Sequence, residues 1–194
     1  MRSFLRLAAC TLPLLAFTAA PNALVVPGRS LGSITLGANA SSLAALGPAT
    51  SGDAAMQKAW ATWRGSRPAN GSAPTQLDVY TAPAGNDVDR HTVQIVRATS
   101  PWFHLTNGLR PGARLSAIRQ AYGPLPLATT YRVAARPRYL YDDVQRGVAF
   151  ETDGTASNSH CQAILVHLPG KAITQSALPL GAYLQEQASP AGRR

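Results

Sequence analysis

Two stretches of the chain, residues 34–48 and 109–124, share one arrangement of apolar and polar positions. Each opens on a glycine turn, continues with apolar side chains at helical spacing, and stops at a Gly-Pro pair. The apolar positions are Leu43 and Leu46 in the first stretch, and Leu115, Ile118 and Tyr122 in the second. Spacings of three, four and seven residues place such side chains on one face, so each stretch predicts a short amphipathic helix.

Segments that alternate between apolar and polar residues follow each predicted helix, and turn residues separate them. Alternation with period two, rich in β-branched and aromatic residues, is typical of strands. The predicted strands are residues 76–81 and 92–97 after the first helix, and residues 130–133, 139–141, 146–151 and 161–167 after the second. Each repeat therefore predicts a short helix followed by a small antiparallel meander.

One segment between the first helix and the first strand allows two interpretations. Met56, Trp60 and Trp63 stand at helical spacing after Asp53, which could cap a helix, so we expect helix up to about Ala59. The alternative is that the two tryptophans begin the first strand. In both cases we expect the aromatic rings to lie in the core.

The pattern as a whole predicts an α+β fold of two tandem repeats, each a short helix or helix pair packed on a small antiparallel β-sheet. We divide the chain into a signal peptide (1–23), a first repeat (24–100), a second repeat (101–170) and a C-terminal tail (171–194). The tail is expected to cover a sheet edge or to be loosely ordered.

The amino terminus has the composition of an export signal. Arg2 and Arg6 precede an apolar run over residues 7–20, which is short for a membrane span, and small residues follow it. We expect cleavage between Ala20 and Ala23, a secreted or periplasmic protein, and no transmembrane segment in the mature chain.

The repeated motif also resembles a known family. The segment from Ile34 to Pro48, its counterpart from Leu109 to Pro124, and the run from Pro101 to Gly112 are similar to the β-lactamase inhibitor protein and the related small outer-membrane assembly lipoproteins. The resemblance covers roughly residues 31–168. It implies a tandem α+β fold, export, and binding through the sheet face or the loops. It implies neither β-lactamase as the partner nor any particular interface residue.

Charge adds a candidate class of partner. The chain has 18 Lys+Arg against 9 Asp+Glu, and loss of residues 1–23 removes two arginines, so the mature net charge is +7. Fourteen of the sixteen remaining basic residues are arginines, the exceptions being Lys58 and Lys171. For this excess alone, a merely solvated basic surface is the favoured interpretation. The functional alternative is attraction to an acidic partner, such as an acidic protein, an anionic envelope polymer or a lipid surface. No nucleic-acid recognition motif is present, so we expect no nucleic acid partner.

Candidate catalytic chemistry is sparse. Residues 28–32 match the G-x-S-x-G nucleophile elbow around Ser30, but no strand and helix are expected to frame that serine. Cys161 would be the one thiol of the mature chain, and its place in an apolar strand favours an inert, buried cysteine. A small secreted hydrolase using Ser30 or Cys161 is therefore the alternative function, and a structural envelope component is another.

Metal and cofactor chemistry are not expected. Residues 87–91, Asp-Val-Asp-Arg-His, could hold a cation if completed from elsewhere, but a solvated hairpin loop is the favoured interpretation. The usual phosphate-loop, dinucleotide and zinc motifs are missing from the sequence, so we expect no cofactor and no bound metal.

For a binding role, the residues of interest are aromatic and arginine side chains that can reach a surface, because these dominate interface energetics. The candidate binding residues are Trp102 and Phe103 in the connector between the repeats, and Arg136, Arg138, Tyr139 and Tyr141 on a strand of the second repeat. Core packing between the repeats is the favoured interpretation for Trp102 and Phe103, and packing onto the second helix is the alternative for the two tyrosines. The function we expect is an exported, non-catalytic binding module for a protein or an anionic envelope component.

Overall fold

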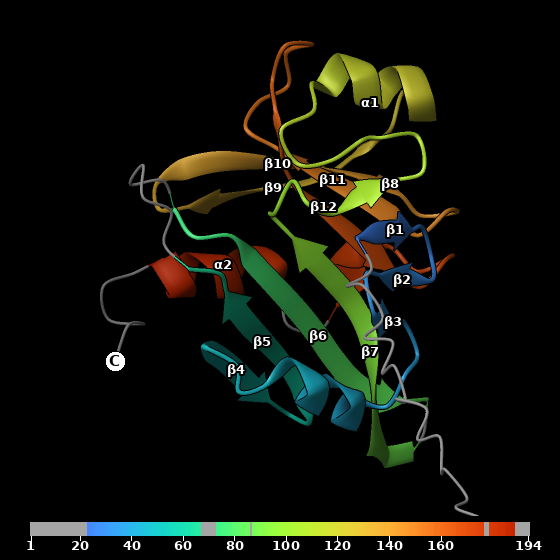
Figure 1. Cartoon of the computed structure of the whole chain (residues 1–194), viewed down its shortest axis with the longest axis vertical. Coiled ribbons are helices and arrows are strands. Elements are labelled where there is room, and N and C mark those ends of the chain that lie inside the picture. The colour runs from blue at the N-terminus through green and yellow to red at the C-terminus, as the bar shows by residue number, and fades with distance from the viewer. Residues whose placement is uncertain (1–22, 67–72, 86, 177–178, 189–194) are drawn as a thin grey trace, which may run out of the picture.

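A computed structural model describes residues 23–66, 73–85, 87–176 and 179–188 (Figure 1). The signal-peptide prediction falls almost entirely on residues 1–22 and lies outside the described part. The largest element is an eight-stranded antiparallel sheet in the order β4-β5-β6-β7-β12-β11-β10-β9. Its strands are β4 (Ser51–Ala55), β5 (Lys58–Arg64), β6 (Gln76–Ala84), β7 (Asp87–Ala98), β9 (Leu127–Val133), β10 (Arg136–Asp143), β11 (Val148–Thr152) and β12 (Cys161–His167).

A second, four-stranded sheet has the order β3-β2-β1-β8. It consists of β1 (Leu24–Val26), β2 (Ser30–Leu31), β3 (Ile34–Thr35) and β8 (His104–Leu105), with β1 and β8 parallel. The described residues form two 3₁₀ helices, η1 (Ala40–Leu46) and η2 (Ile173–Gln175), and two α-helices, α1 (Leu115–Tyr122) and α2 (Leu180–Ala188). In Figure 1 the four-stranded sheet lies in front of the eight-stranded sheet, and α2 lies behind the eight-stranded sheet.

The predicted α+β class is wrong, because the two meanders do not form separate small sheets. β7, the last strand of the first meander, pairs with β12, the last strand of the second, from Ile95↔His167 to Ala98↔Ile164. This pairing makes one continuous sheet, and the few short helices pack on that shared surface. The protein is therefore mainly β, and it is not a pair of independent helix-on-sheet units.

The helix expected up to Ala59 is also wrong. β4 and β5 form a tight hairpin there, and Met56 and Gln57 occupy its turn with φ angles of 49° and 61°. The helical spacing of the apolar residues is accidental, because alternation along β5 buries Trp60. The alternative interpretation, in which the tryptophans belong to the first strand, matches the structure.

Each face of the eight-stranded sheet has its own core. On the first, here called the α1 face, residues such as Val96, Phe150 and Ile164 pack with Leu115 and Ile118 of α1 and with the small sheet. On the second, here called the α2 face, the sheet packs against three residues of α2, namely Leu180, Tyr183 and Leu184. The described part of the tail thus covers a sheet face.

Candidate functional site

The buried acidic and basic side chains of the described chain gather on the α2 face. Asp78, Arg97, Asp142, Glu151 and His167 are all buried within strands. Each is the chain neighbour of a residue in the core of the α1 face, namely Val79, Val96, Tyr141, Phe150 and Val166 respectively. Because successive strand side chains point to opposite faces, alternation directs the five polar groups towards α2.

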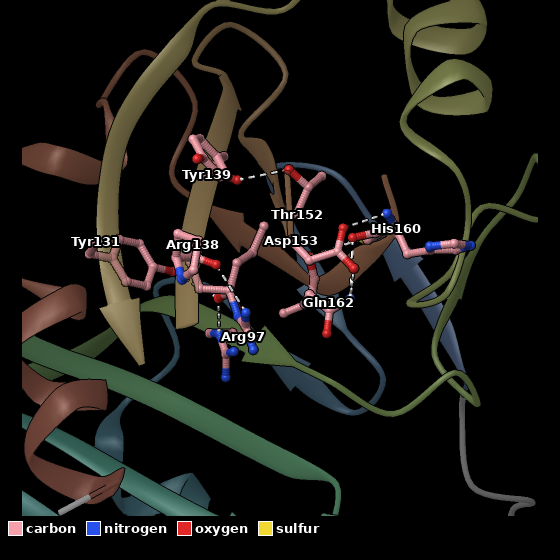
Figure 2. Close-up of polar contacts among 12 residues, drawn as sticks. Arg97, Tyr131, Arg138, Tyr139, Thr152, Asp153, His160 and Gln162 are labelled. Atoms are coloured by element: carbon pink, nitrogen blue, oxygen red, sulfur yellow. Dashed lines mark hydrogen bonds and ion pairs between the residues drawn. The ribbon is translucent and has the colours of Figure 1, made fainter. Parts of the chain in front are cut away.

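Arg97 is the centre of the larger cluster. Its guanidinium donates from Nη1 to Asp78 Oδ2 at 2.6 Å and from Nε to Glu151 Oε2 at 2.8 Å. Tyr131 donates its hydroxyl to the same Glu151 oxygen at 2.8 Å. Arg138 Nε lies 3.0 Å from Glu151 Oε1, close enough for an ion pair but without the alignment of a hydrogen bond. Figure 2 shows Arg97, Arg138 and Tyr131 converging at this point.

The pKa shifts in this cluster follow from burial and pairing. Burial alone would raise the pKa of Glu151, but the charge of Arg97 and the hydrogen bonds from Arg97 and Tyr131 bring it below its ordinary value. Burial is also the largest cause of the strongly raised pKa of the Tyr131 phenol, and the charge of Glu151 adds to it. Glu151 is therefore held as a carboxylate and Tyr131 as a neutral donor.

The cluster also reaches α2. Thr62 donates its hydroxyl to Asp78 Oδ1, and the Tyr183 hydroxyl lies 2.6 Å from Thr62 Oγ1. Tyr183 stacks on Trp60 with ring centroids 5.5 Å apart. These contacts fix α2 to the sheet, so the role of the buried charges that the geometry supports is structural.

A second buried pair anchors η2. His167 Nε2 lies 2.8 Å from Asp142 Oδ1, and Asp142 Oδ2 accepts the backbone N–H of Ile173 at 3.0 Å. The other ring nitrogen of His167 faces the carbonyl of Leu168 at 3.1 Å. Both ring nitrogens are thus engaged inside the protein, and the pair holds the 3₁₀ turn in place.

Two hollows lie on either side of η2. The first, here called the α2 pocket, has a volume of about 250 Å³ and lies between α2, η2 and the strands β9 and β10. Its walls include Tyr131, Leu140, Ile173, Thr174, Leu180 and Ala182. The second, here called the lysine groove, is wider, at about 470 Å³, and includes Met56, Lys58, Tyr80, Val88, Gln94 and Lys171. Ser176 contributes to both.

The lysine groove brings together the two lysines that follow the predicted signal peptide. Lys58 starts β5 and Lys171 directly precedes the η2 region, yet both line this one hollow. Lys171 Nζ donates to Gln94 Oε1 at 3.1 Å. Among the described residues that line the groove there is no aspartate or glutamate. Met56 and Val88, 77% and 50% exposed, add apolar surface beside the charges.

The six predicted binding residues do not form one surface. Arg136 is exposed near the β9–β10 turn, whereas Arg138 is directed into the buried cluster through Glu151. Tyr139 and Tyr141 pack on the opposite face of the sheet, in the core of the α1 face. Trp102 and Phe103 lie in the connector with their rings edge to face at 4.8 Å; Phe103 packs on that core, and Trp102 is 45% exposed.

The residues around the candidate nucleophile Ser30 are explained by backbone structure. Ser30 lies on β2 in a tight hairpin, and no helix follows it directly. Gly28, the first glycine of its motif, has a φ of 67° and donates its N–H to the Gly147 carbonyl at 3.0 Å. A Cβ there would meet Arg146 O at 2.9 Å, so close backbone packing requires this glycine.

Cys161 is buried in the α1-face core, where burial raises the pKa of its thiol well above its ordinary value. Its Sγ donates to the carbonyl of Ala163 at 3.2 Å. A thiol held neutral in this way is a poor nucleophile.

Residues 87–91 begin β7, where the Asp87 carboxylate accepts the backbone N–H groups of Asp89 and Arg90, both at 3.2 Å. Within the described ranges, no three His, Cys, Asp or Glu side chains are grouped so that they could hold a metal ion. Helices long and apolar enough to cross a membrane are likewise missing from the part of the chain that the structure describes.

Sequence reasoning did not select Lys58 and Lys171, although a signal was present. They stand alone as lysines among fourteen arginines in the mature sequence. The two lysines are far apart in the sequence, so the sequence alone does not show that they share one location. They meet only because η2 folds back over the sheet.

Comparisons with known proteins add little. The sequence matches no known family profile, and no curated protein sequence is significantly similar to it. Among solved structures, it is similar to the uncharacterized protein YfeY from Escherichia coli, with a TM-score of 0.41 and 12% identity over 73% of this chain and 98% of that one. A cysteine-rich secretory protein from Staphylococcus aureus gives a TM-score of 0.40 and 12% identity over 76% of this chain and 49% of that one. At these scores neither likeness bears on function.

Proposed function

We propose that this chain is an exported, non-catalytic binding module for an anionic protein or envelope component, and that it holds anionic groups of this partner in the lysine groove. The observation that carries the proposal is the convergence of Lys58 and Lys171 on one hollow whose described lining includes no carboxylate. An ammonium group is a compact charge on a flexible stem, which suits carboxylates or phosphates presented in varied geometries.

The distribution of acidic residues strengthens the attraction. Three of the nine acidic side chains, Asp78, Asp142 and Glu151, are buried on the α2 face. Because they are buried, they do not directly offset the charge of the basic surface. Within the described ranges, eight arginines are exposed: residues 29, 90, 110, 114, 119, 132, 136 and 146. A surface with this imbalance steers anionic partners towards the protein, and the groove supplies a defined place for them.

The groove also offers apolar contact. Met56 and Val88 are exposed beside the lysines, and a flexible methionine adapts to partner surfaces of different shape. Combined charge and apolar contact favour a partner with an acidic segment flanked by hydrophobic groups. Such binding weakens with salt but is not abolished by it, since salt screens only the charge component.

The test is capture of partners from the envelope extract of the host cell, at low and at high salt. The informative variant is Lys58→Gln/Lys171→Gln, and the matched control is Arg29→Gln/Arg110→Gln, which removes the same charge at two exposed positions away from the groove. We expect the lysine variant to lose at least tenfold of the captured partner and the arginine variant to lose less than threefold. Equal losses in both would mean that net charge alone retains the partner, and no loss in the lysine variant would overturn the proposal.

A further inference from the structure

The α2 pocket differs from the lysine groove in having no charged wall. Its described lining contains no lysine, arginine, aspartate, glutamate or histidine. Tyr131 is its one ionisable lining group, and burial raises the pKa of that phenol well above its ordinary value, so it stays neutral. The pocket is therefore an apolar hollow with hydroxyl groups from Thr129, Thr174 and Ser176 around it.

Its walls are held rigidly. The Tyr131 hydroxyl is fixed by Glu151, which is itself fixed by Arg97, so the phenol ring cannot turn into the hollow without breaking that hydrogen bond. On the opposite side, the backbone of α2 lies directly against this ring. A Cβ on Gly181 would come within 2.6 Å of Tyr131 Cβ. The buried pair of His167 and Asp142 holds the third wall, η2, through Ile173.

We propose that the α2 pocket binds a neutral, largely apolar small molecule of about a dozen non-hydrogen atoms that carries a hydroxyl or carbonyl group. The size follows from the volume, since a cavity of about 150 Å³ accommodates benzene and this one measures about 250 Å³. Hydrophobic walls with a few polar groups are typical of small-molecule sites.

Charge excludes the other ligand classes. An anion would lose its hydration against Leu140, Ile173 and Leu180, and would meet no cationic side chain in the described lining. A cation would meet no carboxylate in the described lining. The α2 pocket and the lysine groove therefore suit different ligands, one neutral and one anionic. The proposal for the pocket does not depend on the proposal for the groove.

The experiment is a ligand-observed NMR titration of the purified protein at neutral pH with 1-naphthol, using 1-naphthoate as the matched anionic probe. We expect saturable, one-to-one binding of 1-naphthol, and at least tenfold weaker binding of 1-naphthoate. The Lys58→Gln/Lys171→Gln variant should bind 1-naphthol with unchanged affinity, which separates this site from the lysine groove.

Two substitutions fill the pocket from different walls. Ala182→Phe acts from α2 and Thr174→Phe from η2, and both positions are exposed, so the protein can fold around the larger side chain. The matched control is Ala121→Phe, at an exposed position on α1. We expect at least a tenfold loss of 1-naphthol affinity in both pocket variants and none in the control, with thermal unfolding showing that all three are folded.

Three results would overturn the proposal. The first is the absence of saturable 1-naphthol binding, and the second is equal binding of 1-naphthol and 1-naphthoate. The third is unchanged affinity in whichever of the two pocket variants is folded.

Discussion

The two faces of the eight-stranded sheet bury different kinds of side chain. The α1 face is filled by aliphatic and aromatic side chains such as Val96, Phe150 and Ile164, whereas the α2 face also buries Arg97 and its carboxylate partners. The two hollows, too, lie beside η2 on the α2 face. An apolar core gains stability from contact area, while a polar one depends on complete pairing. We infer that the α1 face supplies most of the stability and the α2 face the features suited to binding.

The largest effect should come from breaking the central ion cluster. Arg97→Leu leaves Asp78 and Glu151 as buried carboxylates without their main partner, which should cost about 3–5 kcal/mol of unfolding free energy. Urea denaturation measures this. A triple variant, Asp78→Leu/Arg97→Leu/Glu151→Leu, should be more stable than the single one, because no unpaired carboxylate remains. A triple variant that is less stable would show that the pairing itself stabilises the fold.

A cavity in the α1 face should come next. Ile164→Ala removes fully buried apolar volume and should cost about 2–5 kcal/mol. Because the buried ion pairs of the described strands are directed to the other face of the sheet, the loss should be the same at pH 5 and at pH 8, which denaturation at both values tests. A loss that changes with pH would mean that the two faces are coupled.

A smaller loss is expected from one hydroxyl group on the α2 face. Tyr131→Phe keeps the ring but removes the hydrogen bond to Glu151, and bonds to charged groups are worth about 1.5–3 kcal/mol. The value expected here is near the lower end, since Glu151 keeps Arg97. Thermal or urea unfolding gives the difference, and Tyr139→Phe, a part-buried tyrosine on the other face, serves as the control.

The smallest expected effect is a difference in how acid changes the unfolding free energy contributed by each face. The folded-state pKa of Glu151 lies below its ordinary value of about 4.5, so its contribution to stability is complete above about pH 4.5 and is lost as the pH falls towards the folded-state pKa. Unfolding free energy measured between pH 6 and pH 3 should therefore fall less steeply in Glu151→Gln than in the unmodified protein. Ile164→Ala should keep the unmodified slope, and equal slopes in all three would exclude Glu151 as a contributor.

Local sequence patterns predicted much of this fold. Alternation located the cores of β6, β7, β9, β10, β11 and β12, and the spacing of Leu115, Ile118 and Tyr122 before Gly123 located α1. The Gly123 cap has a φ of 80° and donates its N–H to the Arg119 carbonyl, as expected of a helix stop. These successes rest on interactions among residues close in the chain.

The failures involve contacts between distant residues. No local signal distinguishes two small sheets from one large sheet joined at β7 and β12, and that pairing changed the fold class. Met56 and Gln57 form a turn in a backbone region that such residues rarely adopt, so propensity argued against the hairpin. Arg138 was misplaced for a related reason: it was expected at a surface, but its guanidinium pairs with Glu151, which lies on another strand, β11.

The pairing of β7 with β12 also bears on how the chain acquires its structure. Val96 pairs with Val166, so the first meander is complete long before its central neighbour has been synthesised. Until then the Ile95–Ala98 end of β7 lacks its partner strand, and an unpaired strand end of this kind can recruit other chains into aggregates. When β12 forms, it pairs with this end of β7 and places it in the middle of the sheet. Productive folding therefore requires that β12 pairs with β7 before another chain does.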